Sequence, residues 1–389
     1  MRVLFWGSVC VVSYAYVGYA AWLLVRARVR PKPVRRQSHA PSVSIAMVVR
    51  NESSTLERKL TNLVSLNYPP DRMEFVVVSD GSSDDTLQIL SEHSKRDARF
   101  KVISSPVGRG KAAGLNDAVQ NASGEIVVFT DARQIIESDA IRLLMENFVD
   151  AEVGCVSGEL MLGDPSGSET GRGLGLYWRI EKKIRELEAA SGSVVGATGA
   201  LYAARRELLV QVPEETILDD VFLPMNVARR GSRVVFDARA RAWDSPNLGE
   251  RREFARKVRT LSGNYQLLRL APWLLKSENP IRFEFVSHKL MRLLVPFALA
   301  GMLVSSAVMD DAAYRLAAAG QVAFYALGGI ALARLRLGPL ERIADVACTF
   351  VVLNAAALVA FTNFVTGRKA EWVPMRVATP KESRRGVQS

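Results

Sequence analysis

Short apolar runs alternate with helix-like segments between residues 42 and 131, and this alternation restricts the fold more than any other feature of the chain. Leu56, Leu60 and Leu63 recur at the spacing of one helix face, between two runs that are typical of buried strands. Alternating strands and helices predict βαβ units, so we expect an α/β domain with a mostly parallel sheet and helices on both faces. The predicted strands span residues 43–49, 75–79, 100–103 and 125–130.

Long apolar segments lie outside this domain at both ends of the chain. The sequence is 49% hydrophobic but also 23% charged, a balance that fits a soluble domain joined to membrane segments. Residues 3–25 exceed the roughly 20 apolar residues that a helix needs to cross a bilayer. Residues 290–308, 316–333 and 343–365 are further candidates. We therefore expect one N-terminal and about three C-terminal membrane helices in a multi-pass protein.

A basic cluster directly follows the first apolar segment. Positive residues stay on the cytoplasmic side of a membrane, so the cluster predicts an outside N-terminus and a cytoplasmic domain at the cell inner membrane. The net charge of +11 concentrates beside the membrane segments, which favours membrane lipids, not nucleic acid, as partners. Asp345, Asn354 and Asn363 interrupt the last apolar segment, so the side of the C-terminal tail stays open. The cluster comprises Arg26, Arg28, Arg30, Lys32, Arg35 and Arg36.

A change of periodicity after residue 250 separates the domain from the C-terminal membrane segments. Val258, Leu261 and Tyr265 repeat at helical spacing, while Arg256 and Arg259 fall on the opposite side. This pattern is typical of a helix in the membrane interface, and a domain helix with a solvated basic face is the alternative. The predicted parts are a transmembrane helix (1–26), a basic linker (27–41), the α/β domain (42–249), interfacial amphipathic helices (250–289), transmembrane helices (290–366) and a polar tail (367–389).

Polar residues follow three of the predicted strands. Ligands of open α/β sheets bind beyond the carboxyl ends of the strands, so Glu52, Asp80 and Asp131 should line one crevice. The Asp80 carboxylate can accept hydrogen bonds from a ribose hydroxyl or a base imide. The alternative, a turn or a helix cap, fits Asp84 and Asp85 better.

A glycine-rich loop, residues 108–114, comes between the third and fourth predicted strands. Free backbone N–H groups at the start of a helix, together with Lys111, favour a diphosphate. A dinucleotide fingerprint belongs after the first strand, where Arg50, Asn51 and Glu52 stand instead. The loop by itself is therefore a weak signal.

Two acidic motifs are candidates for the chemistry. Asp131 ends the fourth predicted strand, where it can hold Mg²⁺ or Mn²⁺ together with phosphate oxygens, although a cap on the following residues is the alternative. Asp219 and Asp220 are expected on a later loop. Adjacent carboxylates raise the proton affinity of at least one of them, which favours a general base. A solvated acidic loop continuing Glu214 and Glu215 is the alternative.

The order of these motifs resembles family-2 glycosyltransferases of GT-A fold, above all the membrane-anchored bacterial members that include polysaccharide synthases. The resemblance extends from Ser42 to Leu270, and the order is more specific than any single motif. The motifs are 48–52 (VVRNE), 79–84 (SDGSSD), 110–112 (GKA) with Asn116, Asp131, Gly199 with Ala200, and Asp219 with Asp220.

The resemblance implies a Rossmann-like, mixed but mostly parallel sheet and an inverting transfer from a nucleotide sugar, most often a UDP-sugar, that forms a β-glycoside. It implies a lipid-linked or polysaccharide acceptor. By the same resemblance Glu52 and Asp80 hold the nucleotide, Lys111 lies near it and Asp131 binds the metal. Asp220, beside Asp219, is then the base, and Gly199 with Ala200 borders the acceptor site.

Two departures from the family pattern concern charge. The usual Asp-x-Asp is Asp131, Ala132 and Arg133 here, so one metal ligand is missing and dependence on Mg²⁺ or Mn²⁺ stays open. Processive members of the family carry Gln-x-x-Arg-Trp, and this chain has residues 256–260 (RKVRT) instead. Synthesis of a long polymer is therefore less supported. Arg256 and Arg259 are still expected to reach the donor diphosphate.

Other functions are compatible with these residues. A non-catalytic, membrane-anchored nucleotide-sugar-binding subunit of a polysaccharide export or synthesis complex would explain Arg133 but not the retained Asp219 and Asp220. A dinucleotide-dependent oxidoreductase is a weaker third hypothesis. The donor sugar, the linkage, single or repeated addition, and any oligomer or export partner are not predicted.

Overall fold

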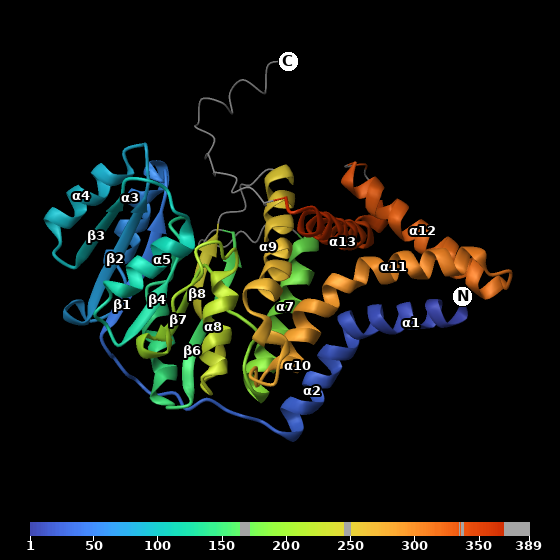
Figure 1. Ribbon diagram of the computed structural model, residues 1–389, viewed down its shortest axis with the longest axis horizontal. Helices are drawn as coiled ribbons and strands as arrows, with labels where there is room; N and C mark the ends of the chain where they lie inside the picture. Colours follow the sequence, from blue (N-terminus) through green and yellow to red (C-terminus); the bar gives the residue numbers. More distant parts are fainter. Residues whose placement is uncertain (164–171, 245–249, 334, 336–337, 369–389) are drawn as a thin grey trace, which may run out of the picture.

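An eight-stranded mixed sheet forms one end of the molecule, and long helices form the other (Figure 1). The computed structural model describes residues 1–163, 172–244, 250–333, 335 and 338–368. Most of the predicted polar tail, residues 369–389, lies outside the described residues.

The sheet runs in the order β3-β2-β1-β4-β7-β6-β8-β5. The first four strands in this order are parallel, β7 is antiparallel to both of its neighbours, β6 and β8 are parallel, and β5 is antiparallel to β8. The mixed, mostly parallel sheet is therefore confirmed. The strands are β1 (Val43–Val49), β2 (Met73–Asp80), β3 (Phe100–Ser105), β4 (Ile126–Phe129), β5 (Ile135–Ile136), β6 (Val153–Leu162), β7 (Tyr202–Arg205) and β8 (Arg233–Asp244).

The central strands are almost continuously apolar because helices cover the sheet. In β1 every residue except Val48 is buried, as expected for a parallel strand with neighbours on both sides. Leu56, Leu60 and Leu63 are fully buried on one face of α3, which confirms the predicted helix. The helices of this part are α3 (Ser53–Val64), α4 (Thr86–Arg96), α5 (Lys111–Gln120), α6 (Ala140–Met145), α7 (Arg172–Ser191), α8 (Asp219–Arg229) and α9 (Glu250–Leu270). Short 3₁₀ helices span Pro70–Arg72, Glu146–Val149, Arg206–Leu208, Pro272–Leu275 and Gly338–Leu340.

Four helices of the described residues are long and apolar enough to cross a membrane, one N-terminal and three C-terminal, as predicted. The first, Arg2–Val29, joins α1 (Arg2–Ser13) to α2 (Tyr19–Val29) through a π-helical turn. The second, Arg282–Val308, joins α10 (Arg282–Phe285) to α11 (Met291–Val308) through another π-helical turn, Val286–Leu290. The others contain α12 (Ala312–Leu332) and α13 (Glu341–Thr366).

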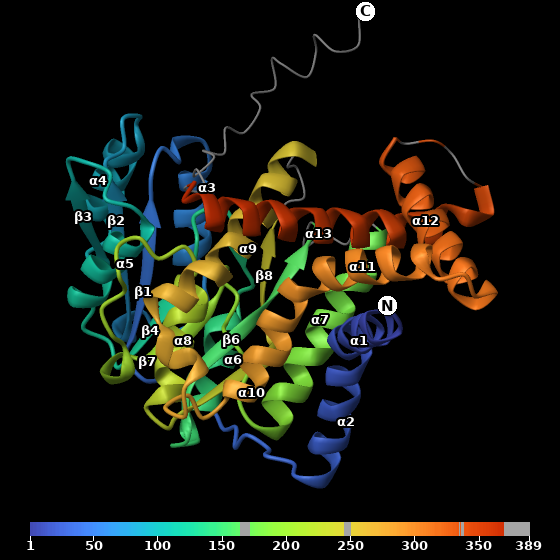
Figure 2. The ribbon, with the colours of Figure 1, turned by 45° about the vertical axis from the view of Figure 1, so that its right-hand side comes forward.

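Helix α9 connects the sheet domain to these helices. It crosses α13 (Figure 2). Tyr265 of α9 stacks on Phe364 of α13 with ring centroids 5.4 Å apart. Leu267, on the same helix, is fully buried in the domain core. The predicted amphipathic helix therefore has two packed sides, and its place in a membrane interface stays a prediction.

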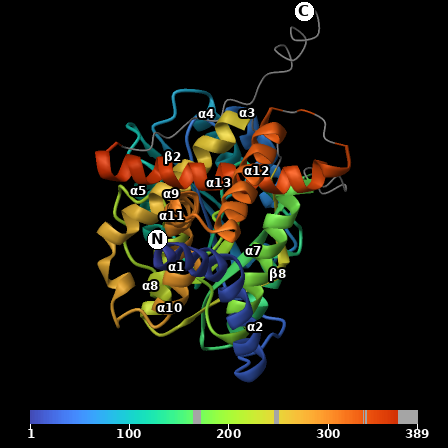
Figure 3. The ribbon, with the colours of Figure 1, turned by 90° about the vertical axis from the view of Figure 1, so that its right-hand side faces the viewer.

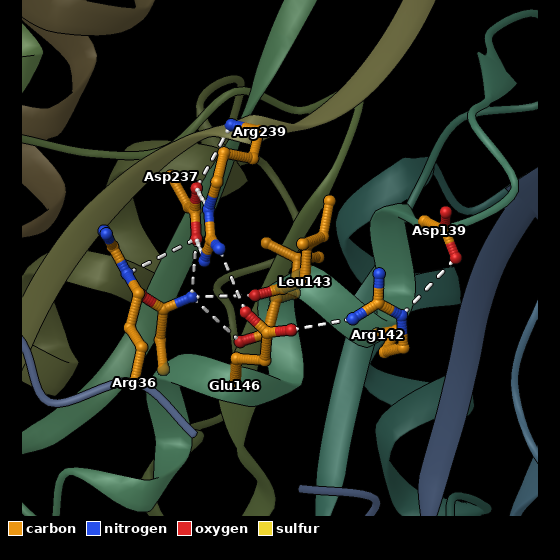
Figure 4. A network of polar contacts seen from close by, with 9 residues as sticks. Arg36, Asp139, Arg142, Leu143, Glu146, Asp237 and Arg239 are labelled. Atoms are coloured by element: carbon orange, nitrogen blue, oxygen red, sulfur yellow. Dashed lines mark hydrogen bonds and ion pairs between the residues drawn. The ribbon is translucent and has the colours of Figure 1, made fainter. Parts of the chain in front are cut away.

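The basic linker is fastened to the domain although it contains no helix or strand. The Arg36 guanidinium donates to Asn147 Oδ1 at 2.8 Å. It also lies 3.6 Å from Asp237 Oδ2 (Figure 4). Asp237 also pairs with Arg239, which reaches Glu146 in turn (Figure 4). Arg36, one cation of the basic cluster, therefore binds polar groups of the protein itself.

Candidate active site

The loops after β1 and β2 are joined at the carboxyl edge of the sheet. Asn51 accepts a hydrogen bond from the Ser83 backbone N–H at 2.8 Å, and the Glu52 N–H donates to Thr86 Oγ1 at 2.9 Å. The Glu52 carboxylate accepts from the Thr55 hydroxyl at 2.8 Å. Burial raises the pKa of Glu52, which Thr55 and the charge of Arg133 partly offset. Glu52 thus stands at the predicted edge, in the electrostatic range of the Asp131 region.

Asp80 is used within the protein. Its side chain is 2% exposed, and its two oxygens accept from the backbone N–H groups of Arg109 at 2.7 Å and Gly110 at 2.9 Å. Gly81 has a φ of +63°, and a Cβ atom there would lie 2.3 Å from the Gly108 nitrogen. The expectation that the N–H groups of this loop are free for a diphosphate is wrong for these two, because Asp80 occupies them. A contact between Asp80 and a nucleotide stays a prediction.

Lys111 follows this loop and begins α5, as expected. Its Nζ lies 2.9 Å from Asp131 Oδ1 and 3.4 Å from Asp219 Oδ2. Burial alone would lower the pKa of Lys111, but Asp131, Asp219 and Asp220 outweigh burial and raise it. Burial likewise acts to raise the pKa of Asp131, and the Lys111 ammonium outweighs it and holds that pKa below its usual value. The ammonium therefore joins the end of β4 to the start of α8.

The aspartate pair occupies the first turn of a helix. We expected Asp219 and Asp220 on a loop, but both belong to α8, where carboxylates are favourable near the positive end of the helix dipole. Asp219 is 4% exposed. The Gly199 N–H donates to Asp220 Oδ2 at 3.1 Å, and the Ala197 N–H donates to the Asp220 carbonyl at 2.7 Å. The predicted pair and Gly199 are therefore adjacent.

Two glycines stand where this loop meets α8, and the backbone conformation of Gly196 favours glycine. A Cβ atom on Gly199 would lie 3.2 Å from Asp220 Oδ2, and Gly196 has a φ of +85°. Ala200 accepts from the Thr130 hydroxyl at 2.9 Å, directly before Asp131. The loop therefore contacts both acidic motifs.

Asp220 has the electrostatics of a base. Burial, then the charge of Asp219, raises the pKa of Asp220 to about 6, and Lys111 partly opposes this rise. At neutral pH such a carboxylate is mostly ionised, yet more basic than an ordinary aspartate. This arrangement can accept a proton from a hydroxyl group.

Arg256 is connected to the site by Asp244, a residue that the sequence did not single out. Asp244, at the end of β8, lies 2.9 Å from Arg133 Nη2 and 3.9 Å from Arg256 Nη1. Burial raises the pKa of Asp244, and the two arginines partly offset this effect. Arg259 shares none of these contacts among the residues that the structure describes. Asp244 gave no signal because its strand was not predicted.

Lys59 is a second missed residue. It is 0% exposed and donates to Thr130 Oγ1 at 2.9 Å and to the Gln134 carbonyl at 2.8 Å. Burial lowers its pKa to about 7. The sequence contained a signal, since Lys59 stands three residues after Leu56 and four before Leu63, within the apolar face of α3.

The residues present do not form a ready divalent-metal site. Asp131 is paired with Lys111, and the second Asp of the usual motif is Arg133, which is paired with Asp244. No group of three or more His, Cys, Asp or Glu side chains within the described ranges could hold a metal ion. We therefore derive no step through a metal.

Comparisons with known proteins agree with this architecture. Residues 44–212 match the family described as glycosyl transferase family 2. The poly-beta-1,6-N-acetyl-D-glucosamine synthase of Staphylococcus aureus (strain COL) is 26% identical over 228 residues, which are 56% of this chain and 53% of the relative. The Staphylococcus epidermidis synthase is 28% identical over 210 residues, 52% of this chain and 49% of the relative. The chain thus spans about half the length of the curated relatives it matches.

A solved structure is similar over nearly the whole chain. The mannosyltransferase PcManGT from Pyrobaculum calidifontis, in complex with GDP-Man and Mn²⁺, aligns with a TM-score of 0.72 and 21% identity. The alignment covers 94% of this chain and 99% of that one, so the fold is shared. The family match therefore assigns residues 44–212 to a family-2 glycosyltransferase domain, and the mixed sheet and the shared fold are those of a GT-A protein.

Proposed function

We propose that this chain is a membrane-bound inverting glycosyltransferase that moves a sugar from a nucleotide-sugar donor to a hydroxyl group of a lipid-linked or polysaccharide acceptor. The observation that carries the proposal is the raised pKa of Asp220 in a cluster with Asp219, Lys111 and Asp131. The cluster provides a base beside a fixed cation, as a single displacement at an anomeric carbon requires.

The proposed reaction is an in-line displacement. Asp220 takes the proton of the acceptor hydroxyl as its oxygen attacks the anomeric carbon. The bond from that carbon to the diphosphate oxygen breaks, and the nucleotide diphosphate leaves with the electron pair. Attack from the opposite side converts an α-linked donor into a β-glycoside.

Cations and the loops around them are proposed to bind the nucleotide-sugar donor. Lys111 provides positive charge at the end of β4, and Arg256 lies beside Asp244 at the same edge. We assign both to the donor diphosphate, with Arg259 as a further candidate on α9. Glu52 and Asp80 are assigned to the nucleotide, Asp80 through the loop that it shapes.

The donor is a UDP-sugar in this proposal. The named relatives are N-acetylglucosamine polymer synthases, so UDP-N-acetylglucosamine is the first donor to test. GDP-mannose is the second, because it is bound in the similar solved structure. The acceptor site borders Gly199 and Ala200.

The metal is the least supported part of the family pattern here. Asp131 is the residue that would hold Mg²⁺ or Mn²⁺, and the similar structure contains Mn²⁺. In this chain the Asp131 carboxylate pairs with Lys111, and Arg133 replaces the second ligand. We therefore propose that Lys111 and Arg256 stabilise the negative charge that develops on the departing diphosphate.

The four apolar helices support a membrane-anchored protein. We propose the inner membrane with the catalytic domain on the cytoplasmic face, because the basic cluster of residues 26–36 follows the first helix. Membrane lipids are then partners as well as environment.

The experiment is nucleotide diphosphate release by the purified full chain in lipid nanodiscs. UDP-N-acetylglucosamine, UDP-glucose and GDP-mannose are offered with a membrane lipid extract, and Asp220→Asn is run in parallel. Release that depends on Asp220 supports the proposal. Binding of a donor without release or transfer supports the non-catalytic subunit instead, the alternative that the Arg133–Asp244 pair favours.

A further inference from the structure

A buried carboxylate links the membrane helices to the domain far from the donor. Glu188 of α7 is 1% exposed. Its Oε1 accepts from the Tyr19 hydroxyl at 2.7 Å and lies 2.8 Å from His288 Nδ1. Tyr19 begins α2 and His288 lies in the π-helical turn before α11, so two helices remote in sequence meet on one oxygen. Figure 2 and Figure 3 show α2 beside α7.

The second ring nitrogen of His288 is also paired with a buried glutamate. Its Nε2 lies 2.8 Å from Glu181 Oε1, and Arg292 donates to Glu181 Oε2 at 2.7 Å. Both glutamates and the imidazole are buried. Because burying an unpaired charge is costly, each of these groups depends on its partners for its position.

The second oxygen of Glu188 points to the loop that holds the proposed base. The Val195 N–H donates to Glu188 Oε2 at 3.3 Å. Two residues later the Ala197 N–H donates to the Asp220 carbonyl, and the Gly199 N–H donates to the Asp220 carboxylate. Three alternate backbone N–H groups of one short loop therefore join Glu188 to Asp220.

The loop has further anchors on the sheet: the Val194 N–H donates to the Val234 carbonyl at 2.8 Å, and the Thr198 N–H donates to Ser157 Oγ at 3.0 Å. Gly196, between the two ends of the link, adopts a φ of +85°, a conformation with no side chain to fix it. Glu188 is thus one of several groups that position this loop, and a shift at Val195 acts on Asp220 through the Ala197 N–H at its carbonyl and the Gly199 N–H at its carboxylate. A misplacement of about 1 Å at a reacting group can reduce turnover about 100-fold.

We propose that Glu188 is a positioning residue for Asp220, through which Tyr19 and His288 make the geometry of the base depend on the docked membrane helices. The inference rests on the proposed function of Asp220. It assigns to the membrane anchor a role in catalysis besides attachment. Glu188 itself touches no reacting atom.

The test compares two tyrosines of the same membrane helix. Tyr19→Phe removes the hydroxyl that binds Glu188, and Tyr14→Phe removes a hydroxyl that pairs with Ser287 Oγ at 2.7 Å without contacting Glu188. Glu188→Gln is the second variant, because it keeps the shape but cannot accept every hydrogen bond of the carboxylate. Each is prepared as the full chain in nanodiscs.

Two readouts are measured. Hydrogen–deuterium exchange of residues 193–201 should increase about 10-fold in Tyr19→Phe and more in Glu188→Gln, and stay unchanged in Tyr14→Phe. With UDP-N-acetylglucosamine or the donor found active, kcat should fall about 5- to 10-fold in Tyr19→Phe with an unchanged donor KM, because a single hydrogen bond is lost.

Several results would overturn the inference. Unchanged exchange in both Tyr19→Phe and Glu188→Gln, or an equal increase in Tyr14→Phe, removes the link from Glu188 to the loop. Increased exchange with an unchanged kcat removes the positioning role. A wild-type chain without turnover on any donor defeats the proposed function, while exchange still decides whether Glu188 holds the loop.

Discussion

Asp80 and Asp220 are both aspartates of the candidate site, but their carboxylates meet different partners. Both oxygens of Asp80 accept backbone N–H groups of one loop, whereas within the described residues the Asp220 carboxylate accepts one, from Gly199, and the Ala197 N–H binds the Asp220 carbonyl. Burial and Asp219 raise the pKa of Asp220 to about 6. The same type of side chain therefore shapes a loop in one place, where both of its oxygens are bound, and can accept a proton in the other, where burial and Asp219 raise its pKa.

The largest effect is expected at the base. Asp220→Asn should keep donor binding but lower kcat by about two to four orders of magnitude, since the amide accepts no proton. Steady-state release of the nucleotide diphosphate and calorimetric donor titration measure the two properties. Asp71→Asn is the control, on an exposed turn at the opposite end of β2 from Asp80. A kcat for Asp220→Asn within about threefold of the wild type would remove the base assignment.

At the other end of the comparison, Asp80→Asn should raise the donor KM about 10- to 100-fold, because one buried N–H of the loop loses its acceptor. The kcat should change less than KM, since the base is untouched. Asp85→Asn, an exposed residue of the same turn, is the matched control. Equal effects of the two variants on KM would show that Asp80 does not shape the donor loop.

The dependence of kcat on pH distinguishes the effects of the neighbouring charges on the pKa of Asp220. Its base form is required, so kcat should fall as pH drops through about 6. Asp219→Asn removes a negative charge that raises the pKa of Asp220, so the acid limb should move to lower pH. Lys111→Met removes a cation that lowers this pKa, so the limb should move to higher pH. Shifts in the same direction would contradict the assigned electrostatics.

The smallest effect is expected from removing divalent ions. Chelation should change turnover less than about twofold, because Lys111 pairs with Asp131 and Arg133 replaces the second carboxylate. Turnover is compared before and after dialysis against a chelator, then with added Mn²⁺. A loss that Mn²⁺ restores would assign a metal to Asp131.

The elements nearest the N-terminal half of the domain were predictable. Residues 43–49 are a strand with the predicted limits, since a buried parallel strand is a short apolar run between breakers. The four candidate membrane helices of the described residues were equally clear, because a span requires an uninterrupted apolar length. The aspartate pair was predicted as a site but on a loop, since apolar residues after Asp220 do not distinguish a loop anchor from a buried helix.

The amino-acid order alone determined the alternating domain, the four apolar helices and the acidic motifs, since each depends on local periodicity or on neighbouring residues. Only the tertiary structure decided that Lys111 joins Asp131 to Asp219, that Asp80 fills the loop N–H groups, and that Glu188 meets Tyr19 and His288. These contacts join residues up to 169 positions apart. Burial and charge at such contacts depend on which segments pack together, and no local pattern contains that information.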